Sequence, residues 1–103
     1  MLFRSDQVVR SYPNDERAPL AAYQLGRIRL GSLGDSRGAL AAFSFAVDHG
    51  RAQSFLADAE LGQIEAQEGL GNLAACRRLR ESFLKEHPSS VQTARVQRAC
   101  GGQ

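Results

Sequence analysis

The sequence has few of the features that mark a membrane protein. Its longest uncharged apolar stretch, residues 38–47, is well short of the roughly 20 apolar residues that a membrane-spanning helix requires. Residues 1–4 lack the charged start, apolar middle and cleavage site of a signal peptide. We therefore expect no membrane span.

Tryptophan is absent, and neither sign of charge is in large excess. The chain holds 13 basic and 11 acidic residues, for a formal net charge of +2 at pH 7. A nucleic-acid-binding domain normally carries a larger positive excess and aromatic side chains on which bases stack. We therefore expect no nucleic acid among the partners.

The motifs that carry catalysis or hold cofactors and metals are also missing. The chain has no Gly-x-Ser-x-Gly sequence. The Gly-Ser-Leu-Gly-Asp segment at residues 31–35 lacks the Gly-Lys-Ser/Thr ending of a phosphate loop. The two histidines, His49 and His87, are far apart in the sequence, and each is expected at a helix C-terminus, where partial positive charge is favourable. We expect a protein that is not an enzyme and that binds no cofactor or metal.

Strand signals are nearly absent, because the chain has no alternating run of β-branched residues and no Asn-Gly or Asp-Gly hairpin turn. Apolar residues instead recur at helical spacing. Six helices are predicted. The first three span residues 2–12, residues 20–30, and the segment from a cap at Ser36 to Gly50. The other three run from about residue 55 to Gly69, from a cap at Asn72 to a stop before Pro88, and from Ser89 or Ser90 onward, with Val91 among the apolar positions of the last helix.

Two parts of the chain match each other at an offset of 36 residues. Leu25-Gly26 matches Leu61-Gly62, and Ala39 matches Ala75. A mid-helix glycine costs about 1 kcal/mol relative to alanine, so we expect both glycines where another helix approaches their backbone closely. The residues assigned to this repeat packing are Leu25, Gly26, Ala39, Phe43, Ala46, Leu61, Gly62 and Ala75. Two unrelated helical hairpins in an alanine-rich chain are the alternative interpretation.

The series Leu25-Gly26, Ala39, Phe43 and Ala46 resembles the tetratricopeptide repeat (TPR) family. In that family Leu-Gly is followed by a small residue that opens the second helix, then by an aromatic residue and an alanine. The second copy departs from the pattern at Leu79, which stands in place of the aromatic residue. The resemblance implies an all-α helix-turn-helix solenoid of about six antiparallel helices with a C-terminal capping helix.

Two proline-containing segments, residues 11–15 and 86–90, look like those of bacterial envelope TPR proteins. That subgroup includes the TolA-binding coordinator of cell division and BamD-like lipoproteins, and the C-terminal segment also resembles the TPR tails of FecR-type anti-sigma regulators. The resemblance implies a location in the bacterial periplasm or envelope. The cytoplasm is the alternative.

The repeat pattern predicts that residues 1–103 form a single domain. Residues 2–17 are the second helix of a partial repeat, residues 18–52 and 53–88 are full repeats, and residues 89–100 are a capping helix. Because solenoids usually need about three repeats, we expect an excised C-terminal piece of a longer protein. A truncated repeat protein that dimerises is the alternative.

In TPR-like stacks the first helix of each repeat lines a concave face on which ligands dock. When the ligand-binding positions of the family are transferred to this sequence, the resemblance implies that the partner is bound by Tyr23, Arg27, Leu30, Ala59, Gln63, Ala66 and Gln67. This implies a scaffold that binds a protein or peptide. Two alternatives remain open: Tyr23 packs against a preceding repeat, or the chain forms a homodimer by burying the apolar side of Leu20, Leu25 and Ile28.

The two cysteines, Cys76 and Cys100, lie equally far on either side of Pro88. If the two flanking helices form an antiparallel hairpin that turns at Pro88, both residues lie at the same height, where a disulfide is possible. A disulfide would indicate an oxidising compartment such as the periplasm. The alternative is a small buried Cys76 and a free thiol at Cys100.

Overall fold

The computed structural model describes residues 15–102, and every regular element in this part of the chain is helical. The elements are α2 (Ala18–Gly31), α3 (Ser36–His49), α4 (Leu56–Gly69), α5 (Leu73–Glu86), α6 (Thr93–Arg98) and the short 3₁₀ helix η1 (Ala99–Gly101). The predicted all-α class is therefore confirmed. The helix predicted over residues 2–12 lies outside the described residues.

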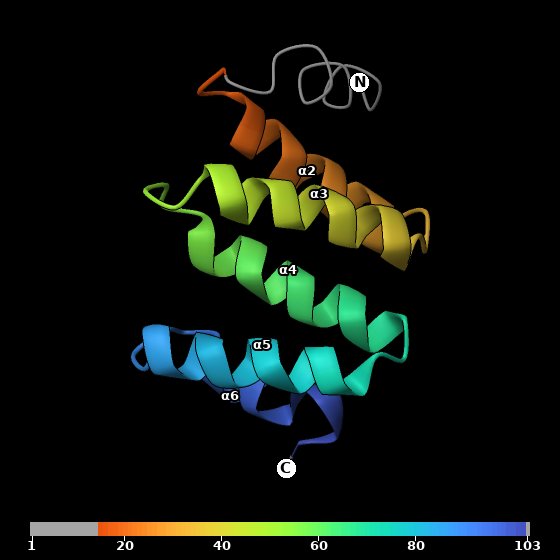
Figure 1. Ribbon diagram of the computed structural model, residues 1–103, viewed down its shortest axis with the longest axis vertical. Helices are drawn as coiled ribbons and strands as arrows, with labels where there is room; N and C mark the ends of the chain where they lie inside the picture. Colours follow the sequence, from red (N-terminus) through yellow and green to blue (C-terminus); the bar gives the residue numbers. More distant parts are fainter. Residues whose placement is uncertain (1–14, 103) are drawn as a thin grey trace.

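Helices α2 to α5 are stacked in chain order, and each runs opposite to the one before it (Figure 1). Each of them packs mainly against its neighbours in the chain, while α6 and η1 fold back against α5, and η1 also contacts α4. Contacts between α2 and α4 bring the first helices of the two predicted repeats together on one side. Within residues 15–102, no helix is both long enough and apolar enough to cross a membrane.

The boundaries of two helices differ in detail from the prediction. Helix α3 is capped by Asp35 rather than Ser36: Asp35 has non-helical dihedral angles (φ −97°, ψ 81°), and its Oδ1 accepts a hydrogen bond from the backbone N–H of Gly38 at 2.9 Å. The last helix begins at Thr93, later than Ser89 or Ser90. Val91 therefore precedes it and is 97% exposed.

The ring of Phe43 joins three helices at the centre of the stack. Phe43 is fully buried, and a Cβ atom placed on Gly26 of α2 would lie 2.7 Å from the ring atom Cε1. A Cβ atom on Gly62 of α4 would lie 2.6 Å from the same ring. The two glycines thus allow a close approach, as expected. The approaching group is a side chain of α3 and not a helix backbone.

The other residues assigned to repeat packing are also inside the structure. All eight are buried: Leu25, Gly26, Ala39, Phe43, Ala46, Leu61, Gly62 and Ala75. The small residues among them let helices approach, and the leucines and Phe43 fill the space between. Three pairs that match at the 36-residue offset are therefore buried in both hairpins: Leu25 and Leu61, Gly26 and Gly62, and Ala39 and Ala75.

A carboxylate holds the turn before α2. Oδ1 of Asp15 accepts hydrogen bonds from the backbone N–H of Arg17 at 2.8 Å and from its Nε at 3.0 Å. These hydrogen bonds favour the ionised carboxylate and lower the pKa of Asp15 from 3.8 to about 2.

We predict that the Asp15 carboxyl group titrates with a midpoint of about 2 in an NMR titration of the folded protein. Because the unfolded chain binds this proton more tightly, the stabilisation is present above the unfolded pKa and is lost as the pH falls toward 2. Arg17→Ala removes both side-chain hydrogen bonds, those from Nε and Nη2, and should move the midpoint upward. A wild-type midpoint at the ordinary value of 3.8 would contradict the prediction.

Candidate functional site

Helices α2, α3, α4 and α6 line a groove on the side of the stack where the first helices of the two predicted repeats meet. We call it the first-helix groove. Its volume is about 140 Å³, and it is lined by Tyr23, Arg27, Phe43, Asp58, Leu61, Gly62, Glu65, Gln92 and Arg95. It unites residues from four helices with Gln92, the residue that precedes α6.

Tyr23 and Arg27 form one wall of the groove. They lie one turn apart on α2, and Nη1 of Arg27 donates a hydrogen bond to the Tyr23 hydroxyl at 3.0 Å. The Tyr23 ring is stacked on Phe55 with centroids 5.6 Å apart and is tilted against Phe43 at 6.1 Å. Tyr23 therefore has a packing role within the described chain as well as a place in the groove.

The opposite wall carries charges of both signs. On α4, the carboxylates of Asp58 and Glu65 face the groove, and Glu65 forms an ion pair with Arg95 of α6. The hydrogen bond to Tyr23, together with the carboxylates of Glu65 and Asp58, raises the pKa of Arg27. Arg27 therefore stays charged, and the groove presents a fixed pattern of positive and negative groups.

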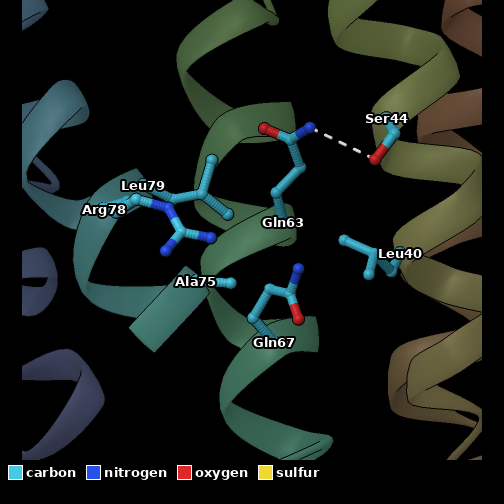
Figure 2. A pocket seen from close by; sticks show the side chains of 7 residues that line it. All are labelled: Leu40, Ser44, Gln63, Gln67, Ala75, Arg78 and Leu79. Atoms are coloured by element: carbon cyan, nitrogen blue, oxygen red, sulfur yellow. Dashed lines mark hydrogen bonds between the residues drawn. The ribbon is translucent and has the colours of Figure 1, made fainter. Parts of the chain in front are cut away.

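Gln63 and Gln67 lie elsewhere, on the side of α4 that faces α3 and α5, the second helices of the two predicted repeats. They line a second-helix pocket of about 300 Å³ with Leu40, Ser44, Ala75, Arg78 and Leu79. Figure 2 shows α4 as its floor, with α3 on one side and α5 on the other. Nε2 of Gln63 donates a hydrogen bond to Ser44 Oγ at 3.3 Å, while Oε1 of Gln67 is buried without a partner among the described residues.

Three further residues of the predicted binding set face the interior. Ala59 and Ala66 are completely buried: Ala59 belongs to a cluster with Ala22, and Ala66 to one with Phe43. Leu30 is half-buried against that second cluster. Ala59 and Ala66 expose no atoms that a partner could contact, which corrects their assignment. The structure thus brings together Tyr23 and Arg27 and adds Asp58, Glu65, Gln92 and Arg95. Ala59, Ala66 and Leu30 lie in or against the two apolar clusters on which Tyr23 also packs. Gln63 and Gln67 are separated from this set.

The apolar patch expected for self-association is also different from the prediction. Leu20 is 44% exposed, but Leu25 is 5% exposed and Ile28 is half-buried. Five helical residues correspond to a rotation of about 140°, so Leu20 and Leu25 face different directions. The three residues do not form one exposed surface.

Comparison with known proteins identifies no relative of this chain. No family model, no curated protein and no solved structure matches the chain. The TPR resemblance therefore stays a prediction from the residues.

Cys76 of α5 and Cys100 of η1 form a disulfide, with Cα atoms 5.7 Å apart. Both residues are fully buried. The same C-terminal turn is held by Arg80, which donates to the carbonyl oxygen of Ala99 at 2.9 Å, and by the backbone N–H of Cys100, which donates to Glu68 at 2.8 Å. The turn is thus fastened to both α4 and α5.

A group of metal-binding residue types lies at the other end of α5. Donor atoms of Glu60, Glu86 and His87 all lie within 4.8 Å of one another. His49, in contrast, is exposed at the end of α3, where it is stacked on Phe45. This group could not be predicted from the sequence, because Glu60 is on a different helix and its distance from His87 depends on how α4 and α5 pack.

Proposed function

We propose that the chain is a non-catalytic TPR-like solenoid that binds a peptide or protein segment in the first-helix groove. The proposal includes a complete stack of about six antiparallel helices and a C-terminal capping role for α6. The 36-residue echo and the shared buried positions of the two hairpins support the repeat. The groove that unites Tyr23 and Arg27 with the charged wall of α4 supports the binding site.

The single observation that carries the proposal is the position of Arg27. It is exposed at the rim of the groove and donates a hydrogen bond to Tyr23. A guanidinium has five N–H donors, so several are left for a carboxylate of a ligand. Aromatic and arginine side chains dominate the energetics of protein interfaces. Asp58 and Glu65 across the groove provide the complementary contact for a basic group and so orient a charged peptide.

We further propose a location in the periplasm or envelope. The disulfide supports it, since disulfides persist in oxidising compartments and are rare in the cytosol. The envelope-like segments at residues 11–15 and 86–90 point in the same direction. A protein isolated from the cytoplasm with both thiols reduced would contradict this location and leave the groove proposal intact.

The test is a selection of random peptides displayed on phage against the immobilised, oxidised chain. We expect enriched peptides that carry a carboxylate, whose affinity falls about tenfold or more in Arg27→Ala, since a hydrogen bond to a charged group is worth about 1.5–3 kcal/mol. Tyr23→Phe keeps the ring contacts with Phe43 and Phe55 and removes the hydroxyl, so it should cost less. Peptide affinities are measured by fluorescence anisotropy.

Two control variants make the test specific to the groove. Arg51→Ala removes an exposed arginine from the turn between α3 and α4 and should leave peptide affinity unchanged. Arg78→Ala removes the arginine of the second-helix pocket. Peptides that lose affinity in Arg78→Ala but not in Arg27→Ala would contradict the first-helix groove, and a selection without enrichment would contradict peptide binding.

A further inference from the structure

Glu60, Glu86 and His87 form a compact group of three donors between α4 and the end of α5. Nε2 of His87 lies 2.5 Å from Oε1 of Glu60, and the donor atoms of all three residues lie within 4.8 Å of one another. The side chains of His87 and Glu60 are 23% and 12% exposed. Glu86 is exposed. His87 and Glu60 are therefore partly withdrawn from water, while the group as a whole is open to a small ion.

The end of α5 is what allows two consecutive residues to point at the same place. Neighbouring residues in a helix point about 100° apart, so Glu86 and His87 could not converge inside one. Helix α5 ends at Glu86, and His87 has non-helical dihedral angles (φ −129°, ψ 57°). This break turns the imidazole toward Glu60 of the neighbouring helix.

Other contacts hold these side chains in position. Ser82 donates a hydrogen bond to Oε1 of Glu86 at 2.9 Å, and the Phe83 ring lies against the imidazole of His87 with centroids 4.9 Å apart. The carbonyl oxygen of His87 accepts a hydrogen bond from the backbone N–H of Ser90 at 3.1 Å. Metal sites use this kind of outer support to orient their ligands.

We propose that Glu60, Glu86 and His87 bind one divalent transition-metal ion of the Zn²⁺ type. An imidazole nitrogen and two carboxylates form a donor set that suits Zn²⁺, Mn²⁺ or Fe²⁺ and that leaves positions for water or a partner's ligand. The ion would replace the direct His87–Glu60 hydrogen bond and link α4 to the end of α5. This site is separate from the first-helix groove and does not depend on the proposed peptide binding.

The test is isothermal titration of ZnCl₂ into the tag-free chain, purified in air without reductant. Both cysteines of the chain are joined in the disulfide, and alkylation with intact-mass analysis verifies that thiolates are absent. We expect saturable binding of one Zn²⁺ per chain and a rise of the melting temperature, because the ion binds only the folded state. MgCl₂ should give neither effect, since Mg²⁺ prefers an octahedron of oxygen ligands.

The matched variants are His87→Gln and His49→Gln, which remove the only two histidines. In His87→Gln the amide can still donate a hydrogen bond to Glu60, so the fold is kept while the metal ligand is lost. Zn²⁺ affinity should fall at least about 100-fold, because even outer contacts of metal sites are worth roughly 10–100-fold. His49→Gln should bind as the wild type does, and Glu60→Gln should bind weakly. Absence of wild-type binding, undiminished binding in His87→Gln, or equal binding of Mg²⁺ would overturn the proposal.

Discussion

Replacing Phe43 with alanine is expected to lower the free energy of unfolding by about 3–5 kcal/mol, the range for large aromatic residues in closely packed cores. Phe43 is fully buried and lies against the backbones of two other helices at Gly26 and Gly62. The cavity would therefore open between α2, α3 and α4 at once. Urea unfolding followed by circular dichroism measures the loss. Phe45→Ala, at a half-buried position on the same helix, is the control and should cost clearly less.

The glycines test the same contact from the other side. Gly62→Ala places a methyl group 2.6 Å from the Phe43 ring, and overpacking of this kind costs about 1–3 kcal/mol. Gly31→Ala meets no atom within 4 Å and should be neutral or slightly stabilising. In a Phe43→Leu background the added methyl group of Gly62→Ala has more room, so its cost should shrink. Equal costs in both backgrounds would show that Phe43 does not hold these helices together.

The helices themselves could be predicted because their signals are local. Apolar spacing and the stop signals at Gly50, Gly69 and Pro88 agree closely with the ends of α3, α4 and α5. The choice between Asp35 and Ser36 as the cap depends on backbone angles that composition does not reveal, since both residue types cap well. The repeat echo likewise indicated that Gly26 and Gly62 need space, but not that a phenylalanine ring fills it.

The candidate site was harder to predict, because it depends on which side of each helix faces which neighbour. Gln63 follows Asp58 by five residues, which is a rotation of about 140° around α4. Asp58 therefore lines the first-helix groove while Gln63 lines the opposite pocket. Glu65 and Arg95 meet across 30 residues of sequence, and a contact of that kind depends on the packing of α6 against the stack. The charges along a single helix do not reveal which charged residues of other helices they will meet.

Reduction of the disulfide is expected to lower the free energy of unfolding by about 2–4 kcal/mol. The two cysteines are 24 residues apart, and a closed loop of this length removes about 3.5 kcal/mol of chain entropy from the unfolded state in the simplest estimate. Both sulfur atoms belong to fully buried residues in the same cluster as Phe83 and Val96. Urea unfolding with and without a phosphine reductant measures the difference, and intact mass after alkylation verifies the state of the thiols.

The loss should be greatest at the C-terminal turn, because the disulfide is the covalent link between this turn and α5, and only non-covalent contacts, such as the hydrogen bonds with Arg80 and Glu68, remain once it is broken. Cys100 has a left-handed backbone conformation (φ 59°) that is unfavourable for a residue with a side chain. Once the link to Cys76 is broken, this turn can relax, and hydrogen exchange should accelerate first in η1 and α6 and only later in α3. A Cys76→Ala/Cys100→Ala variant should have the stability and the hydrogen-exchange pattern of the reduced protein, and adding the reductant should not change either of them. If air-kept wild-type protein takes up two alkyl groups without reduction, the thiols are free, and the support for a periplasmic location is removed.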